Sequence, residues 1–164
     1  MLLASPRTPI IEVERRIRIA APLPTVFALA ADLRHDARWR REIHRTLLDG
    51  PAPGPGVVAT EDAFLSPTCP HALTRLGYVA YEPERYVRCT ALAGEAAWQD
   101  VERRFQPAGP AHTDLTYTLR FELAVVQRGL RLAPPQWLLR GYTRWMMGRY
   151  LRRLQRLLER GAAA

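Results

Sequence analysis

The chain has 164 residues, of which 48% are hydrophobic and 24% are charged, a composition typical of a folded domain. A domain of this length buries roughly 70% of its unfolded surface, so it needs neither a disulfide nor a metal to fold. The net charge of +8 comes from 24 arginines without a single lysine, which suggests GC-rich coding and makes the charge a weak indication of nucleic-acid binding.

The N-terminal segment and the cysteines give no sign of export. Residues 1–9 lack the regions of a signal peptide, and no apolar run approaches the roughly 20 residues that span a bilayer. Cys69 and Cys89 show no paired spacing, so we expect reduced thiols. We therefore expect a cytoplasmic protein, monomeric or homodimeric, with an extended or disordered tail over residues 1–9, one domain over 10–160 and a short tail over 161–164.

Along the chain, the first expected element is a strand at residues 11–19, where isoleucine and valine alternate with charged residues and Arg15 interrupts the apolar face. Apolar residues at helical spacing then predict a helix over 23–33, and a second short helix is expected over 35–43, carrying Trp39. Polar residues lie at the junction of these helices, where such residues usually cap a helix or face solvent: Asp32, His35 and Asp36.

A loop rich in proline and glycine at residues 49–56 separates these helices from a run of short strands. The strands are expected at 57–64, 73–81, 86–92, 97–105 and 113–125. Their connections are too short for parallel crossovers, so they should be antiparallel neighbours. In the last strand apolar and polar residues alternate cleanly, which predicts a sheet with one dry face and one wet face.

The partner of the dry face is expected to be one long helix at 136–160, after Pro134 and Pro135. Its second half separates an apolar stripe from an arginine stripe at positions 149, 152, 153, 156 and 160. In the first half Leu138, Tyr142 and Trp145 extend the apolar zone onto the azimuth of the later arginines, so the buried face is expected to rotate along the helix. Plain core packing and a cover over a cavity both fit this pattern.

The order of these elements resembles the START-like, or SRPBCC, superfamily, in particular its polyketide cyclase/dehydrase and lipid-transport branch. The resemblance rests on the opening strand running into residues 20–32, on Trp39, on the loop ending at Gly56, on the strand–turn–strand at 81–86 and on the final helix. It covers roughly residues 11–160, and its strength lies in order and spacing. It implies an α+β helix-grip fold: a curved antiparallel sheet of six to seven strands around a long C-terminal helix, with two short helices after the first strand.

The resemblance also implies an internal cavity for an apolar ligand. Residues on the expected inner faces of the sheet and helix are the predicted lining: Trp39, Phe64, Gln99, Val101, Arg103, Tyr117, Leu119, Phe121, Leu138, Tyr142, Trp145 and Met146. The strand at 97–105 is ambiguous, because Val101 favours an inward odd-numbered set and Trp98 the even one. An inward Arg103 would need a carboxylate neighbour or a polar ligand group, since an unpaired buried charge is costly.

No recognisable catalytic or cofactor motif accompanies this fold, so catalytic residues are unknown and neither a cofactor nor a metal site is expected. His35, His44, His71 and His112 show no ligand pairs at helical spacing. Cys69 and His71 form a two-ligand fragment without a second pair to complete a tetrahedral site.

Three functions remain open from the sequence. The first is binding of a hydrophobic small molecule such as a lipid, polyketide or quinone. The second is an aromatase/cyclase-like activity on a carbonyl-rich substrate, with arginine or tyrosine polarising carbonyls. The third is docking of the arginine stripe, Arg149, Arg152, Arg153, Arg156 and Arg160, on an anionic membrane, with nucleic acid the less expected partner.

Overall fold

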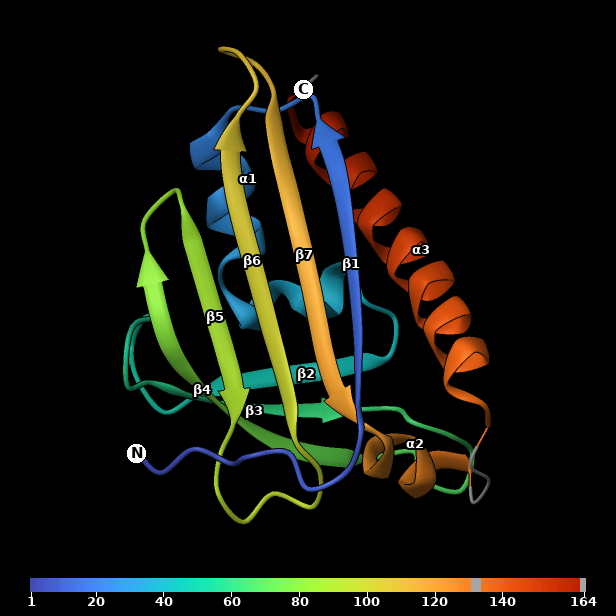
Figure 1. The fold of residues 1–164 in the computed structure, drawn as a ribbon. Coiled ribbons are helices and arrows are strands. Elements are labelled where there is room, and N and C mark those ends of the chain that lie inside the picture. The colour runs from blue at the N-terminus through green and yellow to red at the C-terminus, as the bar shows by residue number, and fades with distance from the viewer. Residues whose placement is uncertain (131–133, 163–164) are drawn as a thin grey trace.

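Seven antiparallel strands form one sheet, in the order β1-β7-β6-β5-β4-β3-β2, in this computed structural model, which describes residues 1–130 and 134–162. Figure 1 shows the long strands β6, β7 and β1 side by side, with β2 and β3 crossing behind them. The strands are β1 (Ile10–Ile19), β2 (Ile43–Leu48), β3 (Val58–Ala63), β4 (Ala72–Glu82), β5 (Tyr86–Ala91), β6 (Gln99–Pro107) and β7 (Thr113–Glu122).

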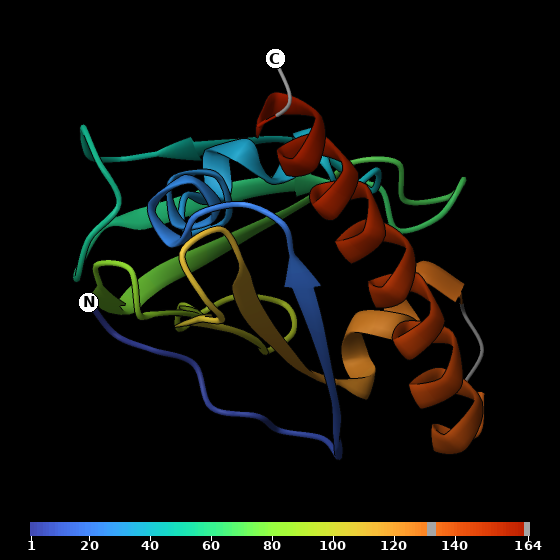
Figure 2. The same ribbon diagram turned by 90° about the horizontal axis from the view of Figure 1, so that it is seen from above.

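The sheet curves around two short helices, and a long helix runs beside its edge strand (Figure 2). The helices are α1 (Leu23–Ala30), the 3-10 helix η1 (Leu33–Arg38), α2 (Leu123–Leu130) and α3 (Gln136–Ala162). α3 packs along β1, where the Glu159 carboxylate accepts the amide of Ala20 at 3.0 Å. The helix-grip fold expected from the sequence is therefore confirmed.

The two faces of the sheet differ as the alternation in the last strand predicts. On the concave face Leu115 and Tyr117 of β7 are fully buried in the core. On the convex face charged side chains pair across strands: Arg120 of β7 bonds Glu12 at 2.8 Å, Asp100 at 3.0 Å and Glu102 at 2.8 Å. Much of the arginine content is thus used in ion pairs over the outside of the sheet.

β2 and α2 are the two elements that the sequence did not predict, and β2 is the one that bears on the site. The residues after the 3-10 helix form a strand at Ile43–Leu48, where the prediction had the end of a short helix. β2 pairs with β3 through Ile43 opposite Ala63 and Arg45 opposite Asp62, so His44 is an extra residue in a β-bulge. The bulge breaks the period-two pattern by which a strand is recognised, which explains why it was missed.

The other differences are the unpredicted helix α2 and the boundaries of three elements. The helix expected over 23–33 ends at Ala30, and the second is the 3-10 helix at Leu33–Arg38, whose first turn is capped by the Asp32 side chain. The strand expected to reach residue 125 ends at Glu122, and Leu123 begins α2. Short apolar runs such as 123–126 fit strand and helix alike, so this error is inherent in pattern reading.

The N-terminal segment lies beside the end of β5 rather than away from the domain. The amide of Ala4 donates to the Ala91 carbonyl at 2.9 Å, and the Ala93 amide donates to the Leu2 carbonyl at 3.0 Å. Farther along, Glu122 accepts the amides of Arg7 and Thr8. Within the described residues, none of the helices combines the length and the apolar character needed to cross a membrane.

Candidate functional site

Arg103 lies at the centre of the interior, with no exposed surface on a strand that the sequence left ambiguous. Val101, Arg103 and Phe105 of β6 all point into the core, so the odd-numbered set faces inward. The carboxylate that such an arginine needs comes from Asp36 of η1: Nη1 donates to Oδ1 at 2.9 Å and Nη2 to Oδ2 at 2.5 Å. Nη1 also donates to the Ala30 carbonyl at 2.6 Å.

A second buried arginine completes a network of alternating charges. Arg40 Nη1 lies 3.1 Å from Asp36 and 3.1 Å from Glu61 of β3, and its Nε donates to Glu42 at 2.8 Å. Burial raises the pKa of Glu61, and Arg40 only partly opposes this. Burial would lower the pKa of Arg103, but Asp36 and Tyr117 more than offset it, so the pKa is raised. Both guanidinium groups therefore remain charged.

Three aromatic side chains surround these arginines. The rings of Trp39, Tyr117 of β7 and Tyr150 of α3 meet edge to face with centroids 5.8–6.2 Å apart. The guanidinium carbon of Arg103 lies 5.1 Å from the ring centroids of both Trp39 and Tyr117. We call Trp39, Arg103, Tyr117 and Tyr150 the interior cluster; it joins η1, two central strands and α3.

The interior cluster contains polar atoms that no described side chain or backbone group satisfies. Trp39 Nε1, Arg103 Nε and the hydroxyls of Tyr117 and Tyr150 are buried without a well-formed hydrogen bond among the described residues, although an Arg103 N–H lies close enough to the Tyr117 hydroxyl to oppose the rise in its pKa. Burial raises the pKa of both tyrosines, so each keeps its proton. Trp and Arg nitrogens only donate, whereas a neutral tyrosine hydroxyl both donates and accepts. The cluster therefore offers four donors against two hydroxyl acceptors.

The other predicted lining residues divide into two groups. Val101 and Phe121 are buried with the interior cluster, whereas Gln99, Leu119 and Met146 are partly buried. A second group is largely in solvent: Phe64, Leu138, Tyr142 and Trp145, with 41–57% of each residue exposed. Their contribution to ligand binding stays a prediction.

The burial pattern of α3 explains why those helical residues lie outside. At about 100° per residue, Leu138, Tyr142 and Trp145 share one azimuth with the later arginines, and all residues of this face are exposed except Arg153, which is partly buried. The buried residues stay on the opposite side from Leu139 to Leu158. The expected rotation of the buried face was therefore wrong. We call this exposed face the outer stripe: Leu138, Tyr142, Trp145, Arg149, Arg152, Arg153, Arg156 and Arg160.

Two hollows border α3, and both lie away from the interior cluster. One, of about 680 Å³, lies between β1 and the first half of α3. Its arginines and glutamates make it unsuited to an apolar ligand: Glu12, Glu14, Arg15, Arg16, Arg140 and Arg144. The other lies between α1 and the end of α3. Neither hollow is lined by a residue of the interior cluster.

Sequence reasoning missed several members of this site. Asp36 was expected at a cap or in solvent, yet it is fully buried between two arginines. Arg40, Glu61 and Tyr150 were not among the predicted site residues, although all three contact the network. The only available signal was the rule that an inward arginine needs a carboxylate, which does not identify the carboxylate.

Comparison with known proteins gives one family and many similar folds. The family model described as "Polyketide cyclase / dehydrase and lipid transport" matches residues 11–159. A START superfamily protein from Mycobacterium smegmatis has a TM-score of 0.72 at 15% identity, covering 92% of this chain and 98% of that one. The Zhui aromatase/cyclase from Streptomyces sp. R1128 has a TM-score of 0.66 at 16% identity, covering 93% and 95%.

A third similar structure is the Polyketide_cyc-like protein Cgl2372 from Corynebacterium glutamicum, with a TM-score of 0.63 at 21% identity, covering 92% of this chain and 93% of that one. At these identities the likeness establishes the fold. A search of the curated proteins finds no match.

Proposed function

Since this chain belongs to the polyketide cyclase/dehydrase and lipid transport family, we propose that it binds a neutral, apolar small molecule carrying a carbonyl group, between the concave face of the sheet and α3. The observation that carries the proposal is the set of unpartnered polar atoms in the interior cluster. Buried polar groups in proteins are almost always hydrogen-bonded, so a group of them beside one another requires an explanation.

The chemistry of these atoms defines the ligand. Because Trp39 Nε1 and Arg103 Nε only donate, the ligand must present an acceptor. The two arginines next to the cluster, Arg103 and Arg40, already face the carboxylates of Asp36, Glu61 and the partly exposed Glu42. A carboxylate would add an uncompensated charge to this interior, whereas a carbonyl oxygen accepts hydrogen bonds at no such cost. A ketone or quinone fits better than a fatty acid.

Entry of a ligand requires the first half of α3 to move. From Gln136 to Met146 only Leu139 and Thr143 are buried, whereas buried residues recur at every turn from Met147 to Leu158. Segments with few buried contacts open at the lowest free-energy cost. The hinge that we propose lies just before Met147, about one turn from the Tyr150 hydroxyl.

The test uses two ligands of nearly the same shape. Full-length protein is titrated with 2-acetylnaphthalene and with 2-ethylnaphthalene, and binding is followed by quenching of tryptophan fluorescence. We expect the ketone to bind about tenfold more tightly, since one buried hydrogen bond to a neutral acceptor contributes about 1 kcal/mol and the cluster offers several donors. Tyr117→Phe and Tyr150→Phe should each reduce this preference, and Tyr86→Phe, at the start of β5 beside the outward-facing Arg104, should not. Equal affinities for the two ligands, or no binding of either, would remove the proposal.

A second candidate function is contact with an anionic membrane through the outer stripe. Trp145 and Tyr142 lie half exposed on the same helix face as five arginines, and the Arg149 guanidinium stacks 4.8 Å from the Trp145 ring centroid. Tryptophan and tyrosine favour the membrane–water interface, and arginine favours anionic headgroups. Cosedimentation should show binding to vesicles containing phosphatidylglycerol that weakens with salt, and Trp145→Ala should reduce it. Equal binding to neutral phosphatidylcholine vesicles, or binding to RNA alone, would contradict this candidate.

A further inference from the structure

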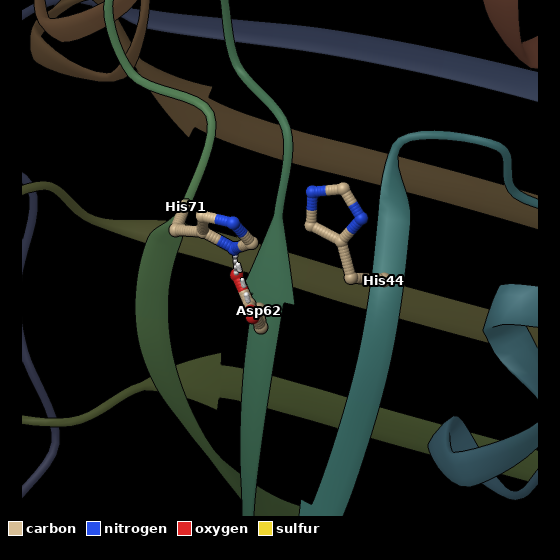
Figure 3. Close-up of side chains that lie close together, drawn as sticks. All are labelled: His44, Asp62 and His71. Atoms are coloured by element: carbon tan, nitrogen blue, oxygen red, sulfur yellow. Dashed lines mark hydrogen bonds and ion pairs between the residues drawn. The ribbon is translucent and has the colours of Figure 1, made fainter.

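Two histidines and an aspartate from three consecutive strands meet on the convex face of the sheet (Figure 3). His44 is the bulge residue of β2, Asp62 lies on β3, and His71 immediately precedes β4. The bulge places two residues, His44 and Arg45, opposite Asp62, so it turns the imidazole toward the face that Asp62 occupies. Without this extra residue, the ladder would not bring all three side chains together in this way.

The distances suit a shared ion. One ligating atom from each of the three residues lies within 4.8 Å of the others. His71 Nδ1 is already 3.1 Å from Asp62 Oδ1, and the two imidazole rings have centroids 4.8 Å apart. Ligand atoms around a tetrahedral zinc ion lie about 3.3 Å apart, given metal–ligand distances of about 2.0–2.1 Å. Rotation of exposed side chains closes the remaining gap.

The pairing of Asp62 is unusual for this chain. Most other buried carboxylates pair with arginine, as Asp36, Asp100 and Asp114 do, and Glu122 accepts backbone amides instead. Arg45 is the residue opposite Asp62 in the β2–β3 ladder. Among the described residues, however, the hydrogen bonds of the Asp62 carboxylate are with His71. A histidine–aspartate hydrogen bond is common by itself. A hydrogen bond alone does not require the second imidazole, which lies beside the first with its plane tilted by 39°.

The geometry points to a binding site for a divalent first-row transition metal, represented by Zn²⁺, formed by His44, Asp62 and His71. Two imidazoles and one carboxylate are a recurrent ligand set for zinc, with water in the open fourth position. Cys69 is not part of this group within the described chain, although it precedes His71 by two residues. No metal site was expected from the sequence. The three residues are far apart along the chain and meet only through strand pairing, so their spacing gave no signal.

Binding at this site has a defined local cost. His44 Nε2 lies 2.9 Å from the Pro70 carbonyl oxygen, so this nitrogen carries the proton in the metal-free protein. Ligation through Nε2 would break the contact with Pro70 and move the ring proton to Nδ1, whereas ligation through Nδ1 would leave that contact in place. The site lies on the opposite face from Glu61, which pairs with Arg40 in the interior. The inference is therefore independent of the ligand proposed for the concave face.

Calorimetric titration of the full-length, reduced protein with ZnCl₂ tests the site. We expect one ion per chain, and His44→Ala, Asp62→Asn and His71→Ala should each weaken binding by more than about tenfold, because even loss of an outer-shell partner costs about 10–100-fold. Co²⁺ should give the visible absorption bands of a four-coordinate site, and His71→Ala should remove them. Urea unfolding of each variant establishes that it folds.

Two control variants separate this site from adventitious binding. His112→Ala removes an exposed histidine on the β6–β7 turn, and Cys69→Ser removes the neighbouring thiol. Both should bind zinc as the original protein does. The inference is overturned if the unmodified protein does not bind zinc at millimolar concentration, if His112→Ala weakens binding as much as His71→Ala does, or if Cys69→Ser abolishes binding.

Discussion

Replacing Arg103 by methionine tests the buried network most directly. Methionine keeps most of the apolar volume of the arginine side chain but removes both bonds to Asp36 and the bond to the Ala30 carbonyl. Asp36 then stays buried with one remaining cation, Arg40, at 3.1 Å. Because the carboxylate keeps this partner, the variant should fold, but with a large loss of stability.

The size of that loss follows from the contacts. Removing one partner of a buried ion pair costs about 3–5 kcal/mol, and the remaining Arg40 favours the lower end. The uncapped Ala30 carbonyl adds about 1 kcal/mol. We therefore expect Arg103→Met to lower the free energy of unfolding by about 4 kcal/mol. With a urea m-value of about 2 kcal/mol/M, the unfolding midpoint should fall by about 2 M.

The neighbouring residue provides a matched control. Arg104 lies on the same strand but faces outward, with 56% of its side chain exposed, and pairs with Glu102. Arg104→Met should lower the free energy of unfolding by less than about 1 kcal/mol, as for other exposed ion pairs. Urea unfolding followed by tryptophan fluorescence measures both variants. Midpoint shifts of similar size would refute the claim that Arg103 and Asp36 form a buried pair.

Three further predictions concern single side chains. Tyr150→Phe should raise the free energy of unfolding by about 1 kcal/mol in urea titration, because it removes a buried hydroxyl that lacks a partner; a loss of stability would show that the hydroxyl is hydrogen-bonded. The two arginines of β1 lower the pKa of Asp114, so its stabilising effect is present above the unfolded pKa of about 3.9 and is lost as pH falls through the lower folded pKa. Asp114→Asn should therefore destabilise the protein at pH 7 and progressively less toward pH 2 in urea titrations, and a constant difference would contradict this. Burial raises the pKa of Cys89, so Ellman's reagent should label Cys69 alone at pH 8 in the native protein and both thiols in urea; rapid labelling of two thiols without urea would refute the burial.

The fold was predictable because its signals are periodic. Alternation in β1 and β7, short breakers between strands and a long proline-free final segment each depend on local sequence, and all three are found in the structure. β2 escaped because its bulge at His44 breaks the alternation. The start of α2 escaped because a short apolar run fits both helix and strand.

The site was predictable only in part, because its parts meet through tertiary packing. Trp39, Arg103 and Tyr117 were expected on inner faces, and the structure buries all three. Asp36 was not recognised, because a short polar residue near a helix junction usually faces solvent. His44, Asp62 and His71 come together only through the register of β2, β3 and β4, which no local pattern specifies.

In the interior cluster, buried hydrogen-bond donors outnumber buried acceptors. Core positions in a domain of this size are usually filled by apolar side chains, yet here two tyrosines, a tryptophan and an arginine present more donors than acceptors. Each such group costs about 1–3 kcal/mol when it is buried and unpaired, a large share of the roughly 5–15 kcal/mol that stabilises a domain. Phenylalanine in place of tyrosine would remove the cost of a hydroxyl and keep the ring packing. A ligand acceptor that contacts these donors accounts for a cost that folding alone does not require.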